Sequence, residues 1–127
     1  MEFQIESDNA VTSLFGYWPK FCDAKFQLLS FLKDASGSKS ILMRLLYLDS
    51  DIEIGAEIEL LFNGVSNIDI NNLYDENVLD ELVFSMSEVS ASSKYIVSIE
   101  SCCGISGVFN CEKITVKSVR NLTDAFS

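Results

Sequence analysis

Three acidic residues at alternate positions are the first group in the sequence whose spacing could do chemistry. Asp49, Asp51 and Glu53 resemble the start of a calcium-binding loop, in which oxygens at alternate positions coordinate the ion. The glycine that such a loop needs stands one place late, at Gly55, and Leu60 occupies the position where a bidentate acid closes the site. The spacing therefore argues against calcium, and we expect neither a metal nor another cofactor.

A second candidate is the pair Cys22 and Asp23, which has the residue types of a nucleophile and an acid. The pattern around this pair predicts a strand, and neighbouring residues of a strand point to opposite faces. The chain has no histidine that could activate the thiol. We therefore interpret Cys22 as a structural residue.

A third candidate is a group of acids in a predicted loop and at the start of the next strand. Paired carboxylates carry out glycoside hydrolysis. No cluster of sugar-binding aromatic residues accompanies these acids beyond Tyr74, so a solvated or partner-facing loop is the better interpretation. The four acids are Asp75, Glu76, Asp80 and Glu81. We expect no enzyme, and one that works with carboxylates alone remains an alternative.

The composition is that of one globular domain over residues 1–127, with 48% hydrophobic residues and no histidine. The N-terminus lacks the pattern of a signal peptide, and no apolar run has the length of a membrane span, so we expect a cytoplasmic protein. In a reducing compartment the cysteines should be free thiols on small buried side chains rather than disulfides or zinc ligands. They are Cys22, Cys102, Cys103 and Cys111.

The acidic residues are concentrated in one part of the chain. The segment from Leu45 to Ser93 contains eleven acids and no Lys or Arg, whereas the other 78 residues hold eight acids and nine bases. Such a field repels nucleic acid and anionic lipid, and it attracts cationic partners. The alternative is that the acids only keep the surface of a small protein solvated.

The elements that must position these residues are mostly strands. Residues 7–15 predict a short helix, with Ser7 or Asp8 as its N-cap and Gly16 after its end. Beyond it, alternation of apolar and polar residues predicts about seven strands without helices long enough for parallel crossovers. The fold class is therefore α+β, a β-rich and mostly antiparallel sheet with one or two short helices.

The clearest strand covers residues 52–62, where apolar residues face one side and Glu53, Glu57 and Glu59 the other. Asn63-Gly64 after it predicts a hairpin to a strand at residues 65–70.

Three further features complete this expectation. Residues 41–48 are apolar on nearly both faces and predict a central strand. Breaks of the alternation predict irregularities at Leu28-Leu29 and near Glu112. Residues 71–79 carry turn formers and predict an exposed loop.

Four segments resemble, in their order and spacing, the immunity protein 50 family, small bacterial proteins encoded beside polymorphic toxins. They are GYWPKFCDAKF at residues 16–26, FNGVS at 62–66, NVL at 77–79 and GVFNCEKITV at 107–116. The chain differs from the family where Cys22 replaces a histidine and Lys25 an acid, so no role is carried over to that pair.

The resemblance implies a single immunity-type domain that binds a cognate toxin in the cytoplasm of the producing cell and blocks it without chemistry. A structural alternative exists for its first segment, in which Trp18, Pro19 and Phe21 fix the chain as it leaves the helix.

From the acidic segment we expect a basic toxin domain as partner, with a nuclease favoured because phosphate-binding sites are cationic, and neither nucleic acid nor membrane. The alternative function is a small structural or adaptor subunit of a larger assembly. The expected partner-binding residues are Glu53, Glu57, Glu59, Tyr74, Asp75, Glu76, Asp80 and Glu81.

Overall fold

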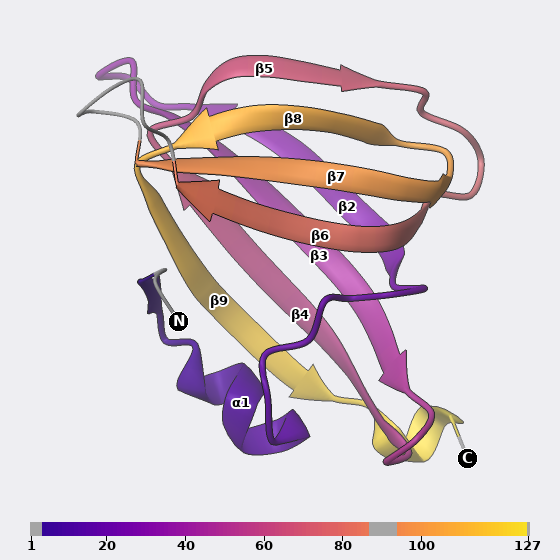
Figure 1. The fold of residues 1–127 in the computed structure, drawn as a ribbon. Coiled ribbons are helices and arrows are strands. Elements are labelled where there is room, and N and C mark those ends of the chain that lie inside the picture. Colours follow the sequence, from indigo (N-terminus) through magenta and orange to yellow (C-terminus); the bar gives the residue numbers. More distant parts are fainter. Residues whose placement is uncertain (1–3, 87–93, 127) are drawn as a thin grey trace.

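The computed structural model describes residues 4–86 and 94–126 and consists almost entirely of strands. One short α-helix precedes most of the strands, and a 3-10 turn closes the described chain (Figure 1). The elements in chain order are β1 Ile5–Glu6, α1 Asn9–Phe15, β2 Lys25–Lys33, β3 Lys39–Asp49, β4 Ile54–Asn63, β5 Ser66–Asn71, β6 Val78–Met86, β7 Tyr95–Cys103, β8 Ser106–Cys111, β9 Lys113–Asn121 and η1 Thr123–Phe126.

The strands form one hydrogen-bonded sheet in the order β1-β9-β4-β3-β2-β6-β7-β8-β5. Figure 1 shows this sheet bent into two layers, with β9, β4, β3 and β2 behind and β6, β7, β8 and β5 in front. The layers join where Lys25, the first residue of β2, pairs with Val78, the first residue of β6. The two layers enclose one core, but on this side they are joined by a single pair of strand residues.

The β-rich class predicted from the alternation is confirmed, but the predicted number of about seven strands is wrong, and the sheet that was expected to be mostly antiparallel is mixed. Nine strands occur in the described chain instead of about seven, and β1 pairs with β9 in parallel. One added strand, β1, is two residues long and too short to show a period. The other arises because the irregularity predicted near Glu112 is a full break, which divides one alternating run of residues into the two strands β8 and β9.

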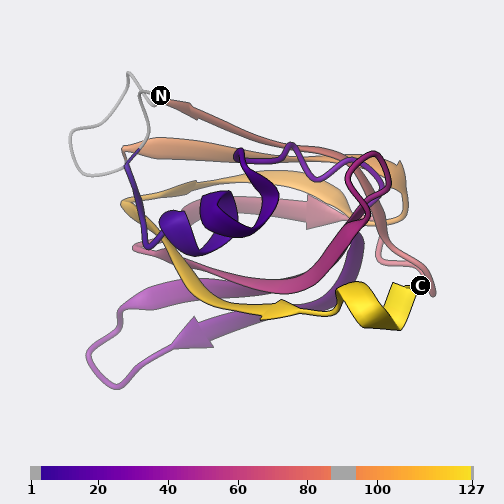
Figure 2. The ribbon, with the colours of Figure 1, turned by 90° about the horizontal axis from the view of Figure 1, so that it is seen from below.

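Helix α1 begins and ends as predicted. Asp8 is its N-cap residue, and Gly16 takes a left-handed conformation with φ 85° while its N–H bonds to the carbonyl of Thr12. Its buried residues Val11 and Phe15 belong to the core, and the helix contacts β9 and β4. Seen from below, α1 lies beside these back-layer strands (Figure 2). The helix thus covers part of the back layer.

The alternation predicted for residues 52–62 is present from Ile54 onward. Ile58, Leu60 and Phe62 of β4 are fully buried, and Glu57 and Glu59 at the alternate positions face outward. Phe62 packs edge-on against Phe109 of β8, with ring centroids 5.1 Å apart, and so connects the two layers. The core therefore lies between the layers, and β4 is one of its walls.

Several other predicted elements are present. Residues 41–48 lie in β3, which has β2 on one side and β4 on the other. The irregularity of β2 falls between Phe26 and Leu28, one residue before the predicted position. The loop predicted at residues 71–79 is confirmed for residues 72–77, while Asn71 belongs to β5 and β6 begins at Val78.

The hairpin predicted at Asn63-Gly64 is wrong. β5 pairs with β8, at the far end of the sheet from β4, so the chain crosses here from the back layer to the front layer. Gly64 does adopt a turn conformation, with φ 65°. The N–H of Glu112 donates to the carbonyl of Asn63 at 2.9 Å, so the chain returns to the back layer at this same corner.

The cysteines are all free thiols, and the prediction that they are buried holds only for Cys111. Cys22, Cys102 and Cys103 are exposed because they lie in turns or at a strand end instead of at inward positions. Burial raises the pKa of the Cys111 thiol to about 12.

Candidate functional site

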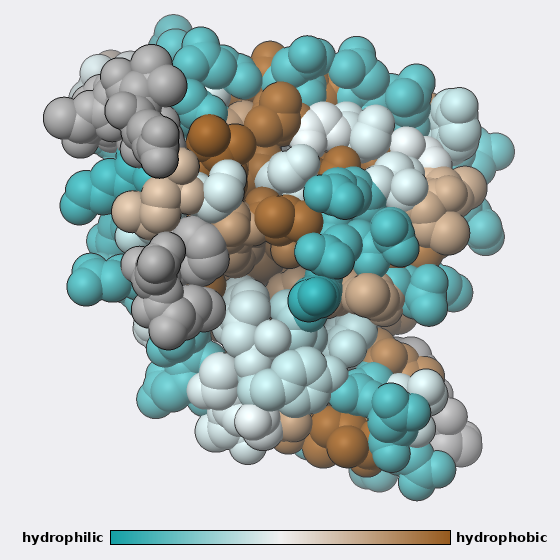
Figure 3. Space-filling view, viewed as in Figure 1, coloured by the Kyte–Doolittle hydropathy of each residue, from teal (hydrophilic) through white to brown (hydrophobic). Residues whose placement is uncertain are grey.

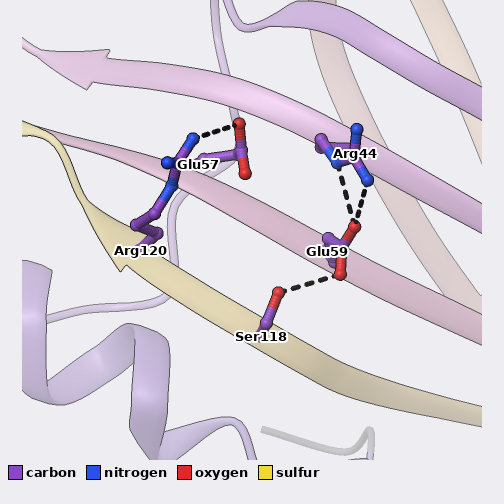
Figure 4. Close-up of polar contacts among 5 residues, drawn as sticks. All are labelled: Arg44, Glu57, Glu59, Ser118 and Arg120. Atoms are coloured by element: carbon purple, nitrogen blue, oxygen red, sulfur yellow. Dashed lines mark hydrogen bonds and ion pairs between the residues drawn. The ribbon is translucent and has the colours of Figure 1, made fainter.

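The outward glutamates of β4 are neutralised by arginines from the neighbouring strands (Figure 4). Arg44 of β3 donates from Nε to Oε2 of Glu59 at 2.9 Å, and the hydroxyl of Ser118 of β9 donates to Oε1 at 2.9 Å. These hydrogen bonds, with Arg44 the larger cause, hold the pKa of Glu59 below its usual range. Arg120 of β9 forms an ion pair of 3.0 Å with Glu57. Both predicted contact residues on β4 thus already have a cationic partner.

Glu53 does not share the outward face of β4. It lies in the turn between β3 and β4 with φ 56°, is exposed, and precedes the first residue of the strand. The prediction that Glu53 continues the row of Glu57 and Glu59 is therefore wrong. In the sequence the alternation of apolar and acidic residues continues through residues 52 and 53, but the extended backbone of β4 begins only at Ile54.

Two tyrosines and an acid form a polar cluster near this turn. The hydroxyl of Tyr17 donates to Oδ2 of Asp49 and lies 3.1 Å from the hydroxyl of Tyr47. Burial and these hydrogen bonds raise the pKa of Tyr17, and burial raises the pKa of Tyr47. Both phenols therefore stay protonated in neutral solution, and the cluster ties Tyr17, two residues after the end of α1, to the end of β3.

The loop between β5 and β6 presents Tyr74, Asp75 and Glu76 to solvent. Tyr74 is 61% exposed, which leaves most of its ring available for contact. This loop is held by Asn77, whose Oδ1 accepts from the N–H of Tyr74 at 3.1 Å and from the N–H of Ile105 at 2.9 Å. The exposed acids therefore lie on a fixed loop.

Asn77 is a positioning residue that the sequence did not assign. Its Nδ2 donates to the carbonyl of Tyr74 at 2.9 Å, and its own carbonyl accepts from the N–H of Phe26 in β2 at 2.9 Å. One side chain and one carbonyl thus join the loop, the turn after β7 and the start of β2. The only sequence feature that pointed to Asn77 was its place in the NVL segment.

Asp80 and Glu81 follow the loop on β6, where Asp80 is exposed and Glu81 half-buried. The segment from Lys20 to Ala24 runs beside them, since the N–H of Leu82 donates to the carbonyl of Lys20 at 3.0 Å. This segment covers the beginning of β6 on the side that faces β2.

The segment around Trp18 packs against the core as expected if its role is to fix the chain where it leaves the helix. Trp18 lies edge-on to Phe21 at 5.8 Å between ring centroids and contacts Phe84 of β6 at 6.3 Å. Pro19 is fully buried. These residues fix the chain between α1 and the sheet, and Trp18 is only partly exposed.

The predicted partner-binding residues thus fall into three regions: the β3–β4 turn, the outer face of β4, and the loop with β6. β3 and β2 separate β4 from β6 in the sheet, and the two strands belong to opposite layers (Figure 1). Only the third region brings several of the predicted residues together without an arginine partner among the described residues. It consists of Tyr74, Asp75, Glu76, Asp80 and Glu81, and we call it the acidic surface.

No protein-family model, curated protein or solved structure matches the chain. Within residues 4–86 and 94–126, no group of three or more His, Cys, Asp or Glu side chains is placed to hold a metal ion. None of the described helices is long and apolar enough to cross a membrane.

Proposed function

We propose that this chain is a binding protein whose acidic surface engages a basic protein partner, without catalysis. The observation that carries this proposal is the contrast between two sets of acids. Glu57 and Glu59 pair with arginines, whereas Asp75, Glu76 and Asp80 are exposed and form no ion pair within the described chain. Exposed acids on a fixed loop speed the encounter with a cationic surface, and burial of Tyr74 slows dissociation.

The partner to test first is a toxin. The resemblance to the immunity protein 50 family makes a cognate toxin in the cytoplasm of the producing cell the proposed target, and the acidity of the chain favours a basic toxin domain such as a nuclease. An immunity gene is expected directly beside a gene whose product ends in a toxin-like domain. That domain is the binding partner to be used in the experiment.

The test reverses three charges of the acidic surface. The variant Asp75→Lys, Glu76→Lys and Asp80→Lys should weaken binding of the toxin domain by about 100-fold or more at low salt, measured by calorimetry or biolayer interferometry. A matched variant reverses the exposed acids Asp51, Glu53 and Glu112 instead. It changes the net charge equally but leaves the acidic surface intact.

If both variants lose the same affinity for the toxin domain, the effect comes from net charge alone. If the first variant keeps its affinity, the acidic surface is not the contact. A genomic neighbourhood without a toxin-like gene, together with stable copurification in a larger complex, would favour the subunit alternative.

A further inference from the structure

Strand β2 has a free edge. It pairs with β3 along its length but with β6 only at Lys25, and the N–H of Phe26 bonds to the carbonyl of Asn77. Past Phe26, no strand of the described chain pairs with this edge. An unpaired edge presents backbone donors and acceptors at every second residue and is a template for another strand.

The residues that present these groups follow from the turn after β2. The N–H of Asp34 donates to the carbonyl of Ser38 across the β2–β3 turn at 3.0 Å, so every second residue before Asp34 also points its backbone groups toward β3. Leu29, Phe31 and Lys33 lie between those residues. Their N–H and C=O groups therefore point to the free edge.

An open groove runs beside this edge, between β2 and the β5–β6 loop. Three adjoining hollows form it. The middle hollow shares Phe26 and Asn77 with the hollow at the acidic end and shares Leu29, Leu73 and Ile105 with the hollow at the β5 end. The hollow at the β5 end has a volume of about 510 Å³ and is lined largely by apolar side chains. The groove therefore provides an apolar wall beside unpaired backbone groups.

Apolar side chains continue along both sides of the groove. Leu29 packs against the core, and Phe31, two residues later on the same face of β2, is 54% exposed. Across the groove Leu73 is 77% exposed. A single strand placed here would bury these side chains with every second residue of its own, which is the geometry of strand addition. By contrast, apolar residues on the front-layer face seen in Figure 3 occur in small separate groups.

The charge at one end of the groove selects its occupant. Asp75 and Glu76 line that end together with Lys25, and both acids belong to the acidic surface. A second copy of the chain, with net charge −10, would bring like charges together there. We propose that the groove binds an extended segment of the basic partner, which adds to β2 as a strand and places a Lys or Arg near Asp75 and Glu76. This inference rests on the proposed function only in taking the partner to be a basic protein.

The test uses a synthetic probe, so it needs no cognate toxin. The probe is a capped peptide with the length of β2, nine residues, that begins with two Lys and continues with alternating Val and Thr. At saturating peptide, amide exchange at Leu29, Phe31 and Lys33 should slow by about 10-fold or more, while Ser30 and Leu32, which point to β3, should change little. The same peptide with an N-methyl group on every backbone nitrogen is the control, because neither of its two edges can then donate hydrogen bonds to β2.

Two variants test the groove in the full chain. Phe31→Pro removes an N–H that points to solvent and is therefore compatible with an edge strand, and it should weaken peptide binding by about 10-fold. Leu73→Asp should weaken binding similarly without touching β2. Ile52→Asp is the matched control, since Ile52 is also an exposed apolar residue in a loop, 44% exposed. It should bind the peptide as the unaltered chain does.

Three results would overturn the inference: no slowing at the three amides under saturating peptide, equal binding by the N-methylated peptide, or a dimer of the free chain that already protects these amides. Its failure is distinguishable from failure of the proposed function. A toxin domain that loses affinity to the charge-reversal variant but binds Phe31→Pro normally supports the acidic surface and excludes strand addition.

Discussion

Glu59 shows how one residue can carry charge without presenting it to a partner. Its side chain is 15% exposed and accepts hydrogen bonds from Arg44 and Ser118. Glu59→Gln should lower the free energy of unfolding at neutral pH by about 1 kcal/mol, because it removes a charge-assisted bond at a partly buried site. Urea denaturation measures this loss.

The pH dependence of that loss follows from the direction of the pKa shift. The pKa of Glu59 is lower in the folded chain than its usual value of 4.5, so the stabilisation is fully present above 4.5 and disappears as the pH falls through the folded pKa. The difference in unfolding free energy between the unaltered chain and Glu59→Gln should therefore become smaller in acid. Glu57→Gln is the control, with a smaller loss, since its partner Arg120 is 65% exposed. A difference that grows in acid would contradict the assignment.

The sequence showed where the acids are but not which of them are paired. Arg44 and Arg120 lie outside the segment from Leu45 to Ser93, which contains no Lys or Arg. Arg120 reaches Glu57 only because β9 pairs with β4. The contact between them depends on strand order, which a local pattern does not contain. The acidic surface could thus be predicted from the loop residues, whereas the neutral face of β4 could not.

At the scale of elements, the turn between β7 and β8 packs directly against the loop that carries Asp75 and Glu76. Gly104 has φ +85°, and a Cβ there would lie 2.3 Å from Oδ1 of Asn77 and 2.7 Å from the carbonyl of Glu76. Gly104→Ala should therefore cost more than about 2 kcal/mol of unfolding free energy, from backbone strain and from displacement of Asn77.

Gly37→Ala is the matched substitution. Gly37 has nearly the same conformation, φ +89°, but nothing lies within 4 Å of the added Cβ. It should cost about 1 kcal/mol from the backbone alone. Equal losses in urea denaturation for the two variants would mean that the contact with Asn77 does not hold the loop.

Individual strands could be read from the sequence because period-two alternation is local. β3 and β4 fall close to the predicted ranges for this reason. Strand pairing could not be predicted in the same way. Asn63-Gly64 specifies a bend in the chain, but it does not specify which strand the next segment pairs with. β5 instead finds β8, which lies far along the chain.

At the scale of the whole molecule, the net charge of −10 opposes the compact state. Salt screens this repulsion, so the urea midpoint should rise between about 10 mM and about 0.3 M NaCl, where the screening length falls from about 30 Å to below 8 Å. A midpoint that falls with added salt would show that the ion pairs at Glu57, Glu59 and Glu6 outweigh the repulsion.

The corner where Glu112 bonds to Asn63 joins both ends of the stretch that builds the front layer. Everything from β5 to β8 thus enters and leaves the back layer at adjacent points, like an insert with its ends tied together (Figure 1). Because its two ends lie together, this stretch can change in length or sequence without moving the points at which it joins the back layer, provided that its inner side chains still pack against Phe62 and the rest of the shared core.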